Sequence, residues 1–94
     1  MKEQDVQRKI IKYLESLGAW TVKTISTTKR GTPDVLACLD GQFIAIEVKR
    51  EGKLNTVSPI QQFQLDKIVE SGGIAVAADS VEKIIEIIGK RGCK

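Results

Sequence analysis

One dipeptide near the middle of the chain, Asp40-Gly41, constrains the fold more than any other feature of the sequence. It separates two apolar segments, residues 34–39 and 42–50. Asp-Gly between two such segments is typical of a two-residue turn joining antiparallel strands, because Asp and Gly tolerate the positive φ that this turn needs. We therefore predict a β-hairpin in which Leu39 pairs with Gln42.

The two strands of this hairpin are apolar on both faces. In the first strand, Val35, Ala37 and Leu39 alternate with Leu36 and Cys38, and the second strand shows a similar pattern. A strand with one face in water normally alternates apolar and polar residues, so this pattern indicates a sheet covered on both sides. The expected class is α/β, with a central mixed sheet flanked by helices.

The rest of the chain alternates between helical and strand periods, with no repeat and no linker, and indicates a single domain over residues 1–94. The expected elements are helix 2–17, strands 19–25, 34–39 and 42–50, helix 59–71, strand 74–78 and helix 81–89. The order is therefore α-β-β-β-α-β-α, with polar loops over residues 26–33 and 51–58. Gly18 is expected to end the first helix, and Ser58 to cap the second.

The sequence contains no histidine, which excludes catalysis by Ser-His-Asp or Cys-His sets and nucleases with a histidine base. The two cysteines, Cys38 and Cys93, have no spacing that suggests a metal site or a disulfide framework. Any metal ion must therefore have oxygen ligands, which Mg²⁺ and Mn²⁺ prefer. The polar N-terminus and the lack of a long apolar run predict a reduced, cytoplasmic protein without a membrane span.

The formal charge is +3, and six of the 15 Lys and Arg residues fall between residues 23 and 53, around the candidate site. Clustering of this kind favours contact with phosphates. The candidate DNA-binding residues are Lys23, Lys29, Arg30, Arg50 and Lys53. Aromatic residues make up only 4% of the chain, which argues against a base-stacking platform.

The hairpin register predicts a pair of carboxylates. Counting outward from the turn places Asp34 opposite Glu47, with both side chains on one face, and Lys49 lies on that face two residues later. Two carboxylates about 5 Å apart on an apolar sheet repel each other and resist desolvation, whereas a divalent cation bound to both removes the conflict. The carbonyl oxygen of Val48 is a further candidate ligand, and Lys49 is placed to polarise a water or hold a phosphate. This set suits hydrolysis of a phosphodiester bond.

A purely structural interpretation competes with this one. Glu47 and Lys49 could be polar residues on an exposed edge strand, and Asp34 could simply end the preceding loop. The apolar neighbours on both faces, the register of the two acids and the basic loop before Asp34 favour the site. Glu3 continues the apolar stripe of the first helix and could aim at the metal, or it could be an acid favoured by the helix dipole. Gln61 could orient a water or a phosphate, or be a solvated residue of a first helical turn.

These residues resemble a known nuclease signature. Gly31-Thr32-Pro33-Asp34 followed by Glu47-Val48-Lys49 resembles the PD-(D/E)XK motif, and the wider sequence is similar to the VRR-Nuc family. The matching segments are Glu3, Asp5-Val6-Gln7, Leu17-Gly18-Ala19-Trp20, residues 31–38, residues 45–50 and Ser58-Pro59-Ile60-Gln61.

The resemblance implies a restriction-endonuclease-like core with Mg²⁺-dependent nuclease activity, in which Mn²⁺ can substitute. By position, Glu3, Asp34, Glu47 and Lys49 take the active-site places, and Gln61 matches the glutamine carried by a helix. Short standalone members of the family, from bacteria and phages, resemble Holliday junction resolvases that act as homodimers on four-way junctions. A bacterial cell or a phage-infected cell is therefore the expected setting.

Three functions remain open at this level. The first is a homodimeric, structure-selective endonuclease that resolves four-way DNA junctions, and the small core of such a chain also favours dimerisation. The second is a nuclease for flaps, nicks or plain duplex in a repair, restriction or defence system. The third is a non-catalytic DNA-binding domain that keeps the fold.

Overall fold

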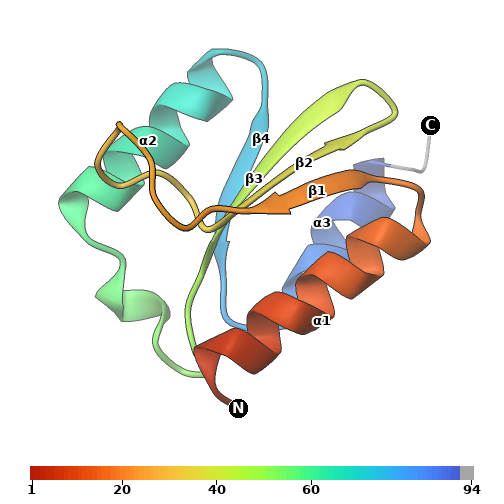
Figure 1. The fold of residues 1–94 in the computed structure, drawn as a ribbon, viewed down its shortest axis with the longest axis horizontal. Coiled ribbons are helices and arrows are strands. Elements are labelled where there is room, and N and C mark those ends of the chain that lie inside the picture. The colour runs from red at the N-terminus through yellow and green to blue at the C-terminus, as the bar shows by residue number, and fades with distance from the viewer. Residues whose placement is uncertain (92–94) are drawn as a thin grey trace.

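A computed structural model of the protein describes residues 1–91 and shows a four-stranded sheet between helices (Figure 1). The elements are α1 (Glu3–Ser16), β1 (Trp20–Lys23), β2 (Val35–Leu39), β3 (Gln42–Val48), the 3-10 helix η1 (Leu54–Thr56), α2 (Pro59–Glu70), β4 (Ile74–Ala78) and α3 (Val81–Arg91). The predicted α/β class and the order α-β-β-β-α-β-α are confirmed. The short helix η1 lies in a segment that was expected to be loop throughout. Cys93 lies outside the described residues.

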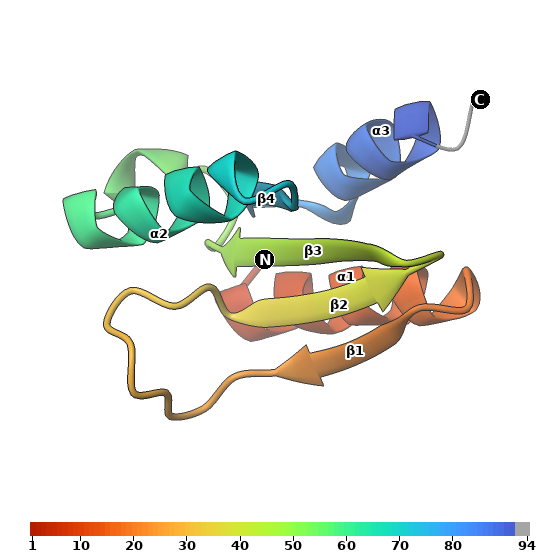
Figure 2. The same ribbon diagram turned by 90° about the horizontal axis from the view of Figure 1, so that it is seen from above.

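The sheet has the order β1-β2-β3-β4, with antiparallel pairing among the first three strands and parallel pairing of β3 with β4 (Figure 2). Leu39 pairs with Gln42 across the hairpin, as predicted. Asp40 and Gly41 both have positive φ, at 52° and 80°, as a tight turn of this hand requires. The dipeptide therefore sets the register of the hairpin.

Three strands are shorter than predicted, and β2 differs only in beginning one residue later, at Val35. β1 was expected to run to residue 25 but ends at Lys23, and the side chain of Ile25 is 94% exposed. Its neighbour β2 begins only after Pro33, which has no N–H to donate to a sheet, so the chain beyond Thr24 has no partner strand. β3 was expected to run to residue 50 but ends at Val48, where its parallel partner β4 also ends.

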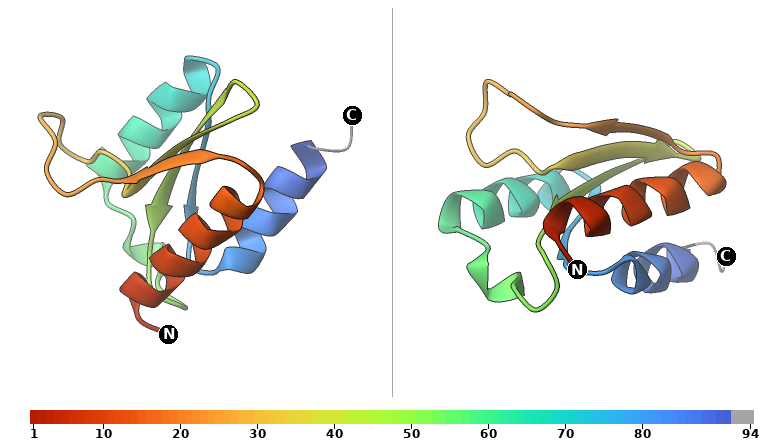
Figure 3. Two further views of the ribbon diagram at one scale, coloured as in Figure 1. Left: turned by 45° about the vertical axis from the view of Figure 1, so that its right-hand side comes forward. Right: turned by 60° about the horizontal axis from the view of Figure 1, so that its bottom comes forward.

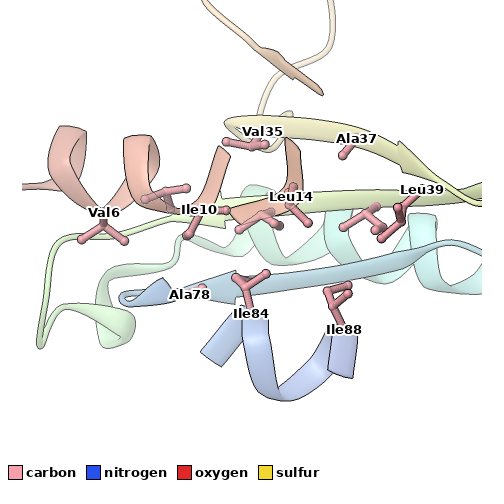
Figure 4. Close-up of a cluster of buried hydrophobic side chains, with 12 residues drawn as sticks. Val6, Ile10, Leu14, Val35, Ala37, Leu39, Ala78, Ile84 and Ile88 are labelled. Carbon is pink, nitrogen blue, oxygen red and sulfur yellow. The ribbon is translucent and has the colours of Figure 1, made fainter. Parts of the chain in front are cut away.

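The main core lies on one face of the sheet, where α1 and α3 pack side by side (Figures 1 and 3). Apolar residues of α1 at three- and four-residue spacing point at the strands and meet those of α3 (Figure 4). The buried cluster contains Val6, Ile10, Leu14, Val35, Ala37, Leu39, Ile44, Ile46, Val48, Ala78, Ile84 and Ile88.

The opposite face carries only α2, which packs on β3 and β4 and buries Leu65 (Figure 1). Over β1 and β2, no element within residues 1–91 covers this face, and Cys38 is exposed there. The prediction of a sheet covered on both sides is therefore correct for β3 and β4 but wrong for the other two strands. The reason is that a single helix is about 10 Å wide, which covers about two strands at a spacing of about 4.8 Å. Among the described helices, none has the length and apolar composition to cross a membrane.

Candidate active site

The two predicted acids, Asp34 and Glu47, lie side by side at the open end of the β2–β3 hairpin, opposite the turn. Asp34 comes directly before β2, and Glu47 is the second-last residue of β3. The observed pairing of Val35 with Ile46 places Asp34 and Glu47 opposite each other at the next position. The Oδ2 atom of Asp34 accepts a hydrogen bond of 2.8 Å from the backbone N–H of Val48, which ties Asp34 to the end of β3.

Glu47 lies in an unusual electrostatic environment. Its side chain is buried, with 3% of the residue exposed, and its Oε1 atom has no hydrogen-bond partner among the described residues. Burial, followed by the nearby carboxylate of Asp34, raises the pKa of Glu47 to about 8, although the ammonium of Lys49 opposes the shift. At neutral pH, and without a cation, Glu47 is therefore largely protonated.

Lys49 and Glu47 are joined through Gln61. The Nζ of Lys49 donates to Oε1 of Gln61 at 3.2 Å, and Nε2 of Gln61 donates to Oε2 of Glu47 at 3.1 Å. The same Lys49 Nζ lies 3.8 Å from Oε2 of Glu47. These contacts form a compact polar cluster on the α2 face of the sheet.

The orientation of Gln61 follows from the start of α2. Ser58 and Gln61 form a capping box, in which the backbone N–H of Ser58 donates to Oε1 of Gln61 at 2.9 Å. Because Oε1 is occupied in this way, Nε2 must face Glu47. Gln61 is therefore not the solvated first-turn residue considered as one alternative. The Ser-x-x-Gln spacing before the helix is the sequence signal that points to this role.

The loop before Asp34 is held close to the start of α2. Gly31 has a φ of +78°, and a β-carbon at this position would lie 2.8 Å from the carbonyl oxygen of Ile60. Only glycine allows both the backbone conformation and this close approach. Gln64 also donates to the carbonyl oxygen of Arg30 at 2.9 Å. The Gly31-Thr32-Pro33-Asp34 segment is thus anchored on the helix that carries Gln61.

Glu3 is exposed at the start of α1, facing the same region. It lines a cavity of about 270 Å³ together with Lys49, Arg50, Lys53 and Thr56, and its charge makes a small further contribution to the raised pKa of Glu47. However, no group of three or more acidic or cysteine side chains within residues 1–91 is close enough to hold a metal ion. Within the described residues, Glu3 therefore lies near the Asp34–Glu47 pair without completing a group of three acids, and its role as a metal ligand stays a prediction.

The predicted DNA-binding residues separate into different surfaces. Arg50 and Lys53 line the 270 Å³ cavity together with Lys49, which contacts Glu47. Lys29 lines a larger groove of about 880 Å³ beside α2, and Lys23 lines a third hollow beside α1. Arg30 is exposed in the loop between β1 and β2, which extends away from the sheet (Figure 2). The structure thus brings Arg50 and Lys53 near Lys49 and places the other three basic side chains on different surfaces, and DNA contact by all five stays a prediction.

The donor set suits a hard divalent cation. A buried carboxylate oxygen without a partner, next to a second carboxylate, offers the anionic oxygens that Mg²⁺ and Mn²⁺ prefer. The N–H of Val48 donates to Asp34. The carbonyl oxygen of Val48 stays a predicted third ligand of the metal ion. The residues present therefore fit the ion that the sequence led us to expect.

Comparison with known proteins agrees with this geometry. The sequence model of the family described as archaeal Holliday junction resolvase (Hjc) matches residues 1–81, which include every predicted site residue. No protein with curated annotation matches the chain.

Two solved structures share the fold. One, named a VRR_NUC domain, has a TM-score of 0.80 and 23% identity, and the match covers 95% of this chain and 96% of that one. The other, named a VRR_NUC domain protein, has a TM-score of 0.73 and 19% identity, with coverage of 95% and 86%. At these identities the likeness shows the fold alone, and it confirms the predicted resemblance to VRR-Nuc domains. Both groups are of the PD-(D/E)XK-like nuclease type, and by the match over residues 1–81 the chain belongs to the Hjc family of Holliday junction resolvases.

Proposed function

We propose that this protein is a metal-dependent endonuclease that cuts phosphodiester bonds in branched DNA, with the four-way junction as its main substrate. The observation that carries the proposal is the pairing of half-buried Asp34 with buried Glu47, which has an unpartnered oxygen and the Lys49–Gln61 contact beside it. Membership of a family named for Holliday junction resolvases supports the choice of substrate.

Asp34, Glu47 and the carbonyl oxygen of Val48 would hold the cation directly, and Glu3 would reach it through water. When bound, Mg²⁺ or Mn²⁺ lowers the pKa of a water molecule and offsets negative charge at the phosphate. The Oε1 atom of Glu47, which lacks a hydrogen-bond partner, would face such a cation. The two carboxylates can then be ionised together.

The remaining side chains bind the DNA phosphates or hold the groups that do so. Lys49 places its ammonium group 3.2 Å from Gln61 and 3.8 Å from Glu47, so its position is fixed before substrate arrives. From there it offsets the charge that develops on the phosphate oxygens during in-line attack. Gln61 holds both Lys49 and Glu47 in place, since its own amide is fixed by Ser58. Arg50 and Lys53 supply charge for neighbouring phosphates.

We also propose that two copies of the chain act together. Trp20, Phe43 and Phe63 are three of the four aromatic residues of the sequence, and they are 64%, 44% and 55% exposed. Trp20 and Phe43 both pair with Cys38 and so share the uncovered face of the sheet, while Phe63 and Phe43 line the 880 Å³ groove next to it. Interface cores are enriched in aromatic residues, and a two-fold dimer would match the symmetry of a four-way junction.

The test of the proposed function is cleavage of an end-labelled four-way junction, with flap, nicked and duplex DNA at the same salt concentration. We expect Mg²⁺- or Mn²⁺-dependent cleavage of the junction that Asp34→Ala, Glu47→Ala and Lys49→Ala abolish. Glu86→Ala, which removes an exposed carboxylate on α3, serves as the matched control and should cleave like wild type.

Other outcomes point elsewhere. Preference for flaps, nicks or duplex would assign the same site to a repair, restriction or defence nuclease. Binding of the junction without cleavage, and without heat of Mg²⁺ or Mn²⁺ binding in calorimetry, would indicate a non-catalytic DNA-binding domain.

A further inference from the structure

The strands β3 and β4 run parallel, and their C-terminal ends lie side by side next to the candidate site. Val48 pairs with Ala78, the last residue of β4, and the N–H of Lys49 donates to the carbonyl oxygen of Ala78 at 2.9 Å. The next residue after Ala78 is Asp79. The carboxyl ends of parallel strands thus bring Asp79 close to the loop that follows Lys49.

Asp79 holds this loop by a specific hydrogen bond. Its Oδ2 atom accepts from the backbone N–H of Gly52 at 2.9 Å, and its Oδ1 lies 3.8 Å from Nζ of Lys83. Only 14% of the Asp79 side chain is exposed, which is low for a carboxylate at the end of a strand. The carboxylate therefore joins the loop to β4 and α3.

The loop itself is a tight turn that presents two cations. The N–H of Lys53 donates to the carbonyl oxygen of Arg50 at 3.0 Å, and Gly52 between them has a φ of +81°. The side chain of Thr56 donates to the carbonyl oxygen of Lys53 at 2.6 Å. Apart from these short-range bonds, the contact between Gly52 and Asp79 links the centre of the turn to the sheet.

The cavity beside the turn has a positive lining. Lys49, Arg50 and Lys53 contribute three positive charges against the single carboxylate of Glu3, and Thr56 adds a hydroxyl group. Such a lining attracts a phosphate group. Lys49 lines this cavity and also contacts Glu47. A DNA phosphate bound in the cavity would therefore be a neighbour, along the DNA strand, of the phosphate at the proposed catalytic site.

We propose that Asp79 is a positioning residue, which fixes the turn over residues 50–53 so that Arg50 and Lys53 hold a phosphate next to the scissile one. The proposal rests on the proposed nuclease function and adds a subsite to it. Without the hydrogen bond to Gly52, the turn would lose its link to β4 and keep the exposed contact of Glu51 with the N-terminal amine of Met1 at 3.4 Å. The turn would therefore be freer to move, and ordering it would oppose DNA binding. Asp79 itself does not line the cavity and acts only through the turn.

A structural role of Asp79 predicts different behaviour. Asp79 stands just before α3, where an acid is favoured by the helix dipole, and its ion pair with Lys83 contributes to stability. If this were its whole role, the loss would appear in the melting temperature and not in the affinity for DNA. Lys83→Gln removes the ion pair but keeps the hydrogen bond to Gly52, so it separates the two roles.

The experiment measures binding of a fluorescent four-way junction by anisotropy, without divalent ions and over a series of NaCl concentrations. For Asp79→Ala we expect Kd to rise about tenfold and the slope of log Kd against log salt to fall by about 1, as for one lost phosphate contact. Asp79→Asn keeps an acceptor oxygen for Gly52 and should bind like wild type, as should Lys83→Gln. In cleavage assays Asp79→Ala should raise KM and leave kcat within about twofold, because the chemical groups stay in place.

A double-mutant cycle identifies the route of the effect. In the background Arg50→Ala with Lys53→Ala, the further change Asp79→Ala should leave Kd unchanged, because its effect passes through those two cations. Additive losses would overturn the proposal, and so would wild-type Kd and salt slope for Asp79→Ala. If Asp79→Ala does not melt cooperatively, Asp79→Ser replaces it, since a serine side chain is too short to reach Gly52.

These outcomes are separable from failure of the proposed function. If the junction is bound but not cut by wild type, or is cut equally by Asp34→Ala, the proposed catalytic site is wrong, while Kd and the salt slope still decide the role of Asp79. If wild type binds no branched DNA, both proposals are overturned.

Discussion

Gln61 donates from Nε2 to Oε2 of Glu47 at 3.1 Å, and this bond joins the first turn of α2 to the end of β3. The same side chain closes the capping box of the helix through Ser58. One residue therefore stabilises the helix and orients the site. The two effects can be measured separately.

Gln61→Ala should lower both stability and activity. Loss of the capping contact costs about 1 kcal/mol, which for a domain of this size lowers the melting temperature by roughly 4–8 °C. Loss of the contacts to Glu47 and Lys49 should reduce kcat by about 10- to 100-fold, as small misplacements of reacting groups do. The control is Gln62→Ala, which removes an exposed side chain that donates a hydrogen bond to Asp66, one turn further along α2. Equal kcat for the two variants would contradict the orienting role of Gln61.

The raised pKa of Glu47 predicts that the metal-free protein loses stability as the pH rises. The pKa is about 8 in the folded state against an ordinary value of 4.5, so the folded state binds more protons than the unfolded state between these values. Stability from this group is complete below about pH 4.5 and is lost as the pH rises through 8, by up to a few kcal/mol.

Thermal melts in EDTA across this pH range should show the decline, and Glu47→Gln should reduce its slope because the amide does not titrate. Saturating Mg²⁺ should restore the stability of wild type at high pH but have little effect on Glu47→Gln. A wild-type melting temperature that rises between pH 5 and 8 in EDTA would show that the pKa of Glu47 is not raised.

Lys49 should influence metal binding as well as catalysis. Its ammonium lowers the pKa of Glu47, so Lys49→Met should raise that pKa further and shift the pH midpoint of Mg²⁺ binding upward. Cleavage should fall by about 100- to 1000-fold, the usual cost of removing a group that stabilises developing charge. Calorimetric titration with Mg²⁺ at several pH values measures the midpoint, and Lys90→Met on α3 is the control. A midpoint that is unchanged or lower would refute the coupling between Lys49 and Glu47.

Gly31 should tolerate substitution far less than other glycines with positive φ. Gly31→Ala combines an unfavourable backbone conformation with a clash against the carbonyl of Ile60, whereas Gly18, with a φ of +93°, has nothing within 4 Å of an added β-carbon. Gly18→Ala should therefore cost about 1 kcal/mol, and Gly31→Ala clearly more. Urea unfolding of both variants tests this difference. Similar midpoints would mean that the loop before Asp34 moves freely relative to α2.

The exposed aromatic residues predict a dimer that one charge can disrupt. Phe63→Glu places a carboxylate in the groove next to Phe43 and should convert a dimer into a monomer while the fold is kept. Light scattering at micromolar concentration gives the mass, and circular dichroism checks the fold. As a control, Phe63→Leu should keep the dimer. A wild-type monomer mass under these conditions would remove the basis for two cooperating sites.

Sequence reasoning was most successful where the signal is local. The Asp40-Gly41 turn determines the hairpin register by itself, and from it follow the pairing of Leu39 with Gln42 and the meeting of Asp34 with Glu47. Helix starts and ends were close to those observed because caps and periodicity are also local.

What the sequence could not provide is the placement of elements against one another. Whether a helix covers β1 and β2, and where the loop with Lys29 and Arg30 extends, depends on packing that no short pattern encodes. The same holds for the position of Glu3, which depends on where α1 begins along the sheet. The capping box of Gln61 can be predicted from Ser58, three residues earlier. Its contact with Glu47 on β3 cannot, because it depends on how α2 packs against the sheet.

The hairpin turn also determines, from the far end of the strands, which residues pair at the site. Asp40-Gly41 lies at the opposite end of β3 from Glu47. A residue added at the turn either lengthens the loop and leaves the pairing as it is, or enters the ladder and advances one strand against the other. With β3 slipped by one residue, Glu47 would enter the apolar layer between the sheet and α1 while Ile46 and Val48 took its place on the α2 face. Two added residues would restore the alternation. Length changes in this turn that shift the register are thus compatible with the Asp34–Glu47 pair only in even steps, although the turn lies at the far end of both strands from these acids.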